Sequence, residues 1–193
     1  MKKISLNLKN KNVIITGGNG FLGSQISDAL LNEKTNVYLI DIKKPKKKTL
    51  AKQFICDITN EGKLKKILKF FKSKKIKIDV LINNAAIDYP PTKSRENNLK
   101  LETFPNNLWD KDISVSLKGS YLCTKVFGSY MSKFKKGTII NVSSDLGIIA
   151  PDQRIYEKNF FVKPVTYSVV KHGIIGLTKY TASYWGKKNI KCL

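Results

Sequence analysis

The sequence predicts an α/β fold, namely a doubly wound parallel sheet in a three-layer αβα arrangement. Short apolar runs alternate along the chain with longer segments of helical period, which is the pattern that such sheets produce. The runs are apolar at successive positions, as in strands that are covered on both faces. A glycine-rich turn separates the first run from the first helical segment. The 193 residues, 41% of them hydrophobic, are enough to bury a core, and we predict one domain over residues 1–193.

Six strands are predicted from the apolar runs. In chain order they are Asn12–Thr16, Asn36–Asp41, 54–58, 78–84, 137–144 and 189–193. Between the fourth and fifth strands, the polar and proline-containing stretch 88–105 predicts a loop.

Four helices are predicted between the strands, at 21–31, 64–71, 109–134 and Val165–Trp185. Within 64–71 the apolar side chains recur at i, i+3, i+4 and i+7, which is the spacing of one helix face. The segment 109–134 is predicted as a helix although Gly119 and Gly128 lower its helix propensity.

The charge is strongly basic, with 36 Lys and Arg against 14 Asp and Glu, for a net charge of +22. Only Arg95 and Arg154 are arginines, whereas specific nucleic-acid readers rely on arginine for base contacts. No stretch approaches the roughly 20 apolar residues of a membrane span, and the first residues lack the apolar centre of a signal peptide. Cys56, Cys123 and Cys192 have the sparse spacing of reduced thiols. We therefore predict a cytoplasmic protein with no nucleic-acid, membrane or metal partner.

The turn after the first strand has the spacing G-x-G-x-x-G from Gly18 to Gly23. Glycines at these positions let the backbone approach a pyrophosphate, which then lies at the helix N-terminus. Asp41 ends the second strand 18 residues beyond Gly23, where a carboxylate accepts hydrogen bonds from an adenosine ribose and repels a 2′-phosphate. The pattern favours NAD over NADP, although Lys43 and Lys44 lie nearby. The alternative is a structural glycine turn with a surface aspartate.

Four motifs in chain order resemble those of the short-chain dehydrogenase/reductase family. They are Thr16-Gly17-Gly18-Asn19-Gly20-Phe21-Leu22-Gly23, Asn83-Asn84-Ala85-Ala86, Asn141-Val142-Ser143-Ser144 and Tyr167-Ser168-Val169-Val170-Lys171. The resemblance extends from about Asn10 to the last residue and implies a Rossmann fold that binds NAD(P).

The resemblance also implies the catalytic residues. Tyr167 is the expected general acid/base, and Lys171, four residues later on the same helix face, favours the tyrosinate and holds the nicotinamide ribose. Ser144 is expected to donate a hydrogen bond to the substrate oxygen. Ser116 stands where the family usually has an Asn that supports a water relay to the lysine. Serine offers one hydroxyl in place of an amide.

The cofactor-binding residues that the resemblance implies come from the glycine turn and from the ends of the strands. They are Gly17, Asn19, Gly20, Phe21, Leu22, Gly23, Asp41, Asp57, Ile58, Asn83 and Ala85, together with Tyr167 and Lys171. The expected activity is hydride transfer between a nicotinamide and an alcohol or carbonyl carbon.

Two further features narrow or complicate the resemblance. Tyr156 lies 12 residues after Ser144, closer to the usual serine–tyrosine gap than Tyr167, but Phe160 occupies the position of the helix lysine. We therefore assign Tyr156 to a loop at 145–163 beside the site. The sequence of this loop resembles the family branch of bacterial surface-glycan and flagellin-sugar pathways, which implies an activated sugar as the substrate.

The family usually continues beyond the position of Leu193 through a Pro-Gly substrate loop and a last strand, so the sequence predicts a chain truncated at its C-terminus. Two alternatives follow from these features: a nucleotide-sugar epimerase or dehydratase with bound NAD, and an inactive truncated NAD-binding remnant. In the family the helices that match 109–134 and Val165–Trp185 pair across a two-fold axis, which implies a homodimer or tetramer.

Overall fold

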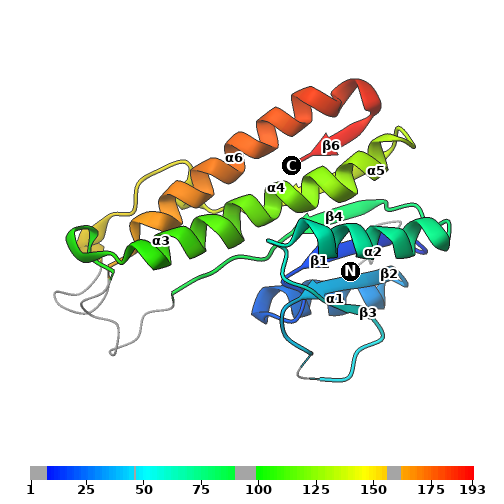
Figure 1. Cartoon of the computed structure of the whole chain (residues 1–193), viewed down its shortest axis with the longest axis horizontal. Helices are drawn as coiled ribbons and strands as arrows, with labels where there is room; N and C mark the ends of the chain where they lie inside the picture. The colour runs from blue at the N-terminus through cyan, green and yellow to red at the C-terminus, as the bar shows by residue number, and fades with distance from the viewer. Residues whose placement is uncertain (1–7, 46, 90–98, 156–161) are drawn as a thin grey trace, which may run out of the picture.

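A computed structural model describes residues 8–45, 47–89, 99–155 and 162–193 of the chain. A six-stranded parallel sheet forms its centre (Figure 1). The strands are β1 (Asn12–Thr16), β2 (Asn36–Asp41), β3 (Lys52–Ile55), β4 (Val80–Asn83), β5 (Gly137–Asn141) and β6 (Ile190–Cys192). The predicted doubly wound α/β fold is therefore confirmed.

The strands lie in the order β3-β2-β1-β4-β5-β6, so the direction in which successive strands are added to the sheet changes beside β1. From β1 the chain builds outward to β3, and it then crosses to the other side of β1 to add β4, β5 and β6. At such a reversal the loops after two neighbouring strands lead away from each other and leave a crevice at the carboxyl ends of the strands, which is where α/β sheets bind ligands. The loops after β1 and β4 flank this crevice.

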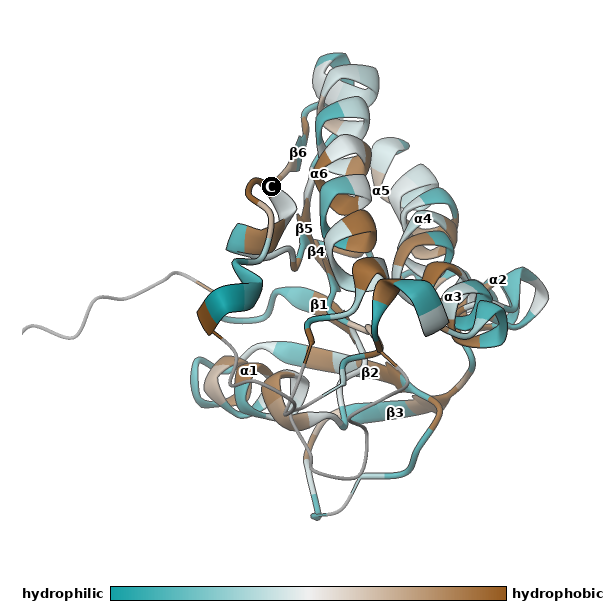
Figure 2. Ribbon diagram, turned by 90° about the vertical axis from the view of Figure 1, so that its left-hand side faces the viewer, coloured by the Kyte–Doolittle hydropathy of each residue, from teal (hydrophilic) through white to brown (hydrophobic). Residues whose placement is uncertain are grey.

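Helices cover both faces of the sheet. On one face, α1 (Phe21–Asn32) packs against a cluster that includes Val13, Ile15 and Leu39. On the other face, α2 (Glu61–Ser73), the 106–132 helix and α6 (Val165–Trp185) cover a larger cluster. Figure 2 shows α1 across the sheet from α2 and α4. The three-layer arrangement thus follows from strands that are apolar on both faces.

The helix over 106–132 is continuous but changes its hydrogen-bond register. It consists of α3 (Asn106–Asp112), a π-helical segment η3 (Ile113–Lys118), α4 (Gly119–Cys123), a second π-helical segment η4 (Thr124–Gly128) and α5 (Ser129–Ser132). It runs beside α6 (Figure 1). Segments of π-helix are often found at functional sites. The shorter 3₁₀ turns are η2 (Leu101–Thr103), η5 (Asp145–Gly147), η6 (Gln153–Ile155) and η7 (Gly186–Lys188).

The strand over 54–58 differs from its prediction, because β3 ends at Ile55. The Asp57 carboxylate accepts hydrogen bonds from the Thr59 N–H at 2.9 Å and the Thr59 hydroxyl at 2.8 Å. This local bonding turns the chain away from the sheet. The predicted strand over 137–144 similarly ends at Asn141, and Ser144 caps η5 instead.

Tyr156 lies outside the described residues. Among the helices that the structure describes, none has the length and apolar character needed to cross a bilayer.

Candidate active site

The glycine turn between β1 and α1 is closed by backbone contacts. Gly17 has φ +63°, and its N–H donates to the Ile40 carbonyl at 2.8 Å. The Gly20 N–H donates back to the Gly17 carbonyl at 3.1 Å. Gly23 packs against the same carbonyl oxygen, so a Cβ at this position would collide with it. The turn therefore depends on glycine for a left-handed backbone at one position and for close packing at another.

Thr16 and Asn84 fasten this turn to the end of β4. The Asn84 amide donates to the carbonyl oxygens of Thr16 at 3.0 Å and Gly17 at 3.2 Å. The Thr16 hydroxyl accepts from the backbone N–H groups of Asn84 at 3.1 Å and Ala85 at 3.0 Å. Neither residue was among the predicted site residues, although both lie within the quoted motifs. Their role depends on pairing across strands that are distant in sequence.

Asp41 lies at the end of β2 and faces the glycine turn. Its Oδ2 accepts from the Asn19 N–H at 2.9 Å, and its Oδ1 accepts from the Lys43 N–H at 2.9 Å. The Asn19 side chain donates to the Lys43 carbonyl at 2.6 Å. These bonds hold the carboxylate and the turn in one geometry. Phe21 and Leu22 begin α1 directly after this turn, and they expose 87% and 48% of their surface, respectively.

The turn fits the phosphates of a dinucleotide. Gly20 precedes α1 and has no side chain with which to cap the helix, and the first turn of α1 contains no acidic residue. The N–H groups of a helix start attract anions when no local carboxylate satisfies them. With the glycine backbone on one side and Asp41 on the other, the residues can hold a pyrophosphate and a ribose.

Three predicted cofactor residues have side chains engaged elsewhere. The exposed Asp57 carboxylate bonds to Thr59, whereas Ile58 is 4% exposed and lies in the core. The Asn83 amide is buried and donates to Asn141 Oδ1 at 2.7 Å and to the Thr124 hydroxyl at 3.0 Å. Ile58 and Asn83 can therefore meet a cofactor only through their backbone.

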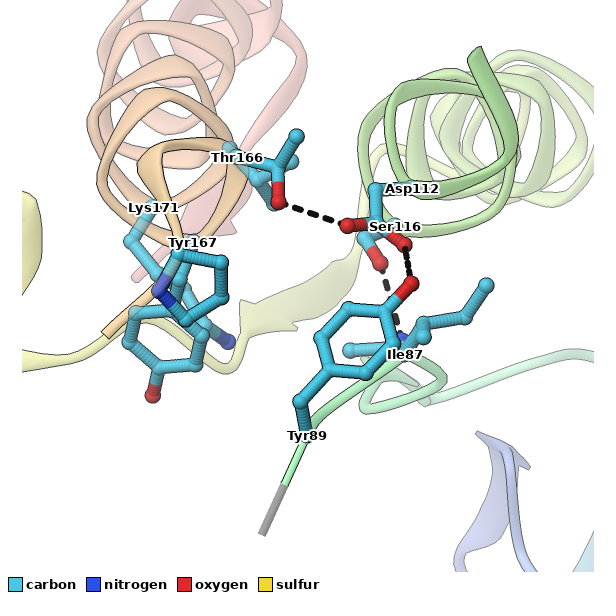
Figure 3. Close-up of a pocket in the computed structure, with 10 residues that line it drawn as sticks. Ile87, Tyr89, Asp112, Ser116, Thr166, Tyr167 and Lys171 are labelled. Carbon is cyan, nitrogen blue, oxygen red and sulfur yellow. Dashed lines mark hydrogen bonds between the residues drawn. The ribbon is translucent and has the colours of Figure 1, made fainter. Parts of the chain in front are cut away.

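Tyr167 and Lys171 share a small cavity of about 10 Å³ at the carboxyl edge of the sheet (Figure 3). Both residues project from the first turns of α6, as their spacing predicts. Lys171 is 7% exposed, its Nζ donates to the Val142 carbonyl at 2.8 Å, and it lies 5.6 Å from the centre of the Tyr167 ring. Burial lowers the pKa of Lys171, the negative charge of Asp88 raises it and the positive charge of Lys163 lowers it further.

Lys163 is a second lysine beside Tyr167, and it was not among the predicted site residues. Its Nζ lies 3.8 Å from the centre of the Tyr167 ring and 3.1 Å from Asp88 Oδ1. The Lys163 side chain is 13% exposed. No local pattern indicates this contact, because Asp88 and Lys163 are 75 residues apart.

Ser144 does not line the cavity that contains Tyr167 and Lys171. Its hydroxyl donates to Asp145 Oδ1 at 2.6 Å and accepts from the Leu146 N–H at 3.2 Å. The Ser144 hydroxyl and the Leu146 N–H hold the pKa of Asp145 below its ordinary value. To donate to a substrate oxygen, Ser144 has to rotate away from Asp145.

Ser116 lines the same cavity as Tyr167 and is 3% exposed. Its hydroxyl accepts from the Ile87 N–H at 3.0 Å, and its carbonyl accepts from the Ser120 hydroxyl at 2.9 Å. One helical turn earlier, Asp112 bonds to Tyr89 and to Thr166 (Figure 3). Ser116 was predicted, but this carboxylate and its two partners were not. An acidic residue four positions before Ser116 was the available signal.

The fold and the site define a class of protein: a Rossmann-type dinucleotide-binding protein with a tyrosine–lysine pair beside the cofactor crevice. Within the described ranges, no group of three or more His, Cys, Asp and Glu side chains could hold a metal ion.

The chain belongs to the short-chain dehydrogenase family. The family model described as "short chain dehydrogenase" matches residues 11–193. A short chain dehydrogenase/reductase of Gibberella zeae, dpfgG, is 32% identical over an alignment of 201 positions, which covers 96% of this chain and 67% of that protein. An NAD-dependent glycerol dehydrogenase of Listeria innocua is 29% identical, with 95% of this chain and 68% of that protein covered.

A short chain dehydrogenase from Leptospira borgpetersenii, solved with bound NAD⁺, superposes with a TM-score of 0.86 at 28% identity, covering 100% of this chain and 72% of that one. Another similar solved structure holds NADP. The predictions of the family and of an oxidoreductase are therefore confirmed. The epimerase alternative is not favoured, because these relatives are dehydrogenases or reductases.

Proposed function

We propose that this protein is an NAD(H)-dependent oxidoreductase that acts on an alcohol or its carbonyl counterpart. The observation that carries this proposal is the placement of Tyr167 and Lys171 in one cavity at the edge of the sheet to which the glycine turn also belongs. The nicotinamide, when bound, supplies or accepts the hydride. The chain itself has to bind the cofactor, orient the substrate and move one proton.

In this proposal Tyr167 exchanges that proton with the substrate oxygen. Lys171 and Lys163 are two cations beside its ring, with Nζ atoms 5.6 Å and 3.8 Å from the ring centre, respectively. Ser144 is assigned the hydrogen bond to the substrate oxygen, and Ser116 supports the backbone of Ile87 at the cavity wall.

The preference for NAD over NADP rests on Asp41. Both oxygens of its carboxylate already accept a backbone hydrogen bond, so the charge is fixed where the ribose is expected. A 2′-phosphate there would face this negative charge. The Gly17–Gly23 backbone, Phe21 and Leu22 are assigned to the pyrophosphate, and Ala85, beside Gly17, to the crevice wall.

An activated sugar is proposed as the substrate, on the resemblance of the loop over 150–157 and 163–167. We further propose that the chain forms one domain in a reducing, cytoplasmic compartment, in keeping with three free, buried cysteines. A homodimer or tetramer is proposed because α6 exposes Val169, Tyr180 and Tyr184 by 40%, 68% and 64%. A symmetric interface would cover these side chains.

The experiment compares the unsubstituted protein with Tyr167→Phe, measuring NADH absorbance with a panel of simple and sugar-nucleotide alcohols. Loss of a positioned acid/base costs about 10²–10⁴-fold in rate, and NADH binding should remain nearly unchanged because only the hydroxyl is removed. Tyr121→Phe, at a half-exposed site on α4, is the matched control. NADH binding without turnover by the unsubstituted protein would support the inactive remnant instead.

A further inference from the structure

We propose that Asp112 is a positioning residue for Tyr167: its buried carboxylate holds Thr166, and through Thr166 the first turn of α6, against the 106–132 helix. The inference rests on the proposed function, because Tyr167 is the acid/base only in that proposal. The role differs from those of Tyr167, Lys171, Ser144 and Ser116, since Asp112 acts through a neighbour of the catalytic side chain.

The contacts of Asp112 join three segments that are distant in sequence. Its Oδ2 accepts a hydrogen bond from the Thr166 hydroxyl at 2.6 Å, and its Oδ1 accepts one from the Tyr89 hydroxyl at 2.8 Å. Asp112 is 3% exposed and Thr166 is 1% exposed. Figure 3 shows the carboxylate between the two hydroxyls, on the wall of the cavity that Tyr167 also lines.

A carboxylate at this position is costly unless it is hydrogen-bonded. None of the ion pairs found among the described residues includes Asp112, so the two hydroxyls are its partners. A hydrogen bond to an ionised acceptor is shorter and roughly twice as strong as a neutral one. The 2.6 Å contact with Thr166 is of this short kind. The two hydroxyls thus offset the cost of burial, and the carboxylate fixes both of them.

The start of α6 needs such an anchor from outside the helix. Pro164 precedes the helix and has no side-chain donor or acceptor that could cap it. Thr166 is the second residue of α6 and the immediate neighbour of Tyr167. Its bond to Asp112 therefore ties the first turn of α6 to the end of α3, and so sets the position from which the Tyr167 ring projects.

Two further hydrogen bonds attach the segment 87–89, at the opposite wall of the cavity, to the same face of the 106–132 helix. Ser116, four residues after Asp112, accepts the Ile87 N–H, and Asp112 accepts the Tyr89 hydroxyl. Asp88, which lies between Ile87 and Tyr89 in the sequence, pairs with Lys163 and so holds its Nζ over the Tyr167 ring. One face of the 106–132 helix thus positions both the tyrosine helix and the segment 87–89.

The test compares Thr166→Val with Thr166→Ser in the 193-residue chain. Valine has the shape of threonine but lacks the hydroxyl, whereas serine keeps it. Because a misplacement of about 1 Å can cost about 10²-fold in rate, we expect kcat to fall at least about 10-fold in Thr166→Val. KM for NADH should be unchanged, and Thr166→Ser should retain most of the activity.

A matched control comes from the same helix. The Thr178 hydroxyl also bonds to a side chain of another element, accepting from the Asn141 amide at 2.8 Å, but it lies three turns beyond Tyr167. Thr178→Val should lower stability without lowering kcat. A double-mutant cycle adds Asp112→Asn: this change should lower kcat when Thr166 is present and add little in Thr166→Val, because the two residues act through one contact.

Amide hydrogen exchange provides a readout that needs neither cofactor nor substrate. The peptide over 164–170 should exchange faster in Thr166→Val and in Asp112→Asn than in the unsubstituted protein, while Thr166→Ser keeps its protection. Unchanged exchange in Thr166→Val would overturn the proposal, as would full kcat in that variant or additive effects in the cycle. An unsubstituted protein that binds NADH but turns over no substrate would instead overturn the proposed function, and the exchange result would still decide whether Asp112 anchors α6.

Discussion

Replacing Gly23 with alanine tests whether the glycine turn depends on close packing. An added Cβ would collide with the Gly17 carbonyl oxygen and would lie 2.9 Å from the Gly18 Cα and 3.0 Å from the Asn84 amide nitrogen. The first two atoms are backbone of the turn, and the third is held by bonds to Thr16 and Gly17. None of them can move aside alone, so the substitution has to displace the turn itself.

The expected magnitude follows from two opposing effects. Overpacking of this kind costs about 1–3 kcal/mol, whereas replacing glycine by alanine inside a helix such as α1 contributes up to about 1 kcal/mol in the other direction. Subtracting the two ranges leaves a loss of about 0–3 kcal/mol, and we expect Gly23→Ala to lower the free energy of unfolding by about 1–2 kcal/mol, near the middle of that interval. Displacement of the turn should also weaken NADH binding about 10-fold, which corresponds to about 1.4 kcal/mol.

Gly186→Ala is the matched control. Gly186 has φ −54° and ψ −47°, and no atom lies within 4 Å of a Cβ added there. Alanine adopts this conformation without strain and should stabilise the protein by about 0.4–1 kcal/mol through the unfolded state. Urea unfolding and NADH fluorescence titration measure both effects. If Gly23→Ala equals Gly186→Ala in stability and binds NADH as the unsubstituted protein does, the packing argument is wrong.

Three more predictions concern the cofactor, the pH dependence and the assembly. Asp41→Ala should narrow the preference for NADH over NADPH in fluorescence titrations, and equal or tighter NADPH binding by the unsubstituted protein would contradict the role of Asp41. Burial raises the pKa of the Cys192 thiol to about 11, whereas the same thiol in the unfolded chain ionises at about pH 9. As the pH rises, ionisation therefore stabilises the unfolded chain before it stabilises the folded one. The free energy of unfolding should therefore fall between pH 9 and 11, and less steeply in Cys192→Ala, as measured by urea unfolding at fixed pH values. Tyr184→Lys should lower the assembled fraction in light scattering, whereas a stable monomer of the unsubstituted protein would count against the interface on α6.

The sequence predicted the elements whose signals are local. The strands Asn12–Thr16 and Asn36–Asp41 and the helix Val165–Trp185 have the predicted bounds, because apolar runs and helical periodicity act over a few residues. The glycine turn and the tyrosine–lysine pair were also visible, since each depends on spacing within one turn or helix. The strand over 54–58 was misplaced because the bonding of Asp57 to Thr59 ended β3 early.

Short, contiguous patterns along the chain thus specify the fold class, the glycine turn and the tyrosine–lysine helix. Which distant residues share the site depends on the tertiary structure. Asp112 meets Thr166 across 54 residues, and Asp88 meets Lys163 across 75. Even the two unfavourable helix glycines are explained only in three dimensions, since a Cβ at Gly119 or Gly128 would lie 2.5 Å from Ile58 or Trp185, respectively. Such contacts depend on how strands and helices are stacked, and no spacing along the chain specifies that stacking residue by residue.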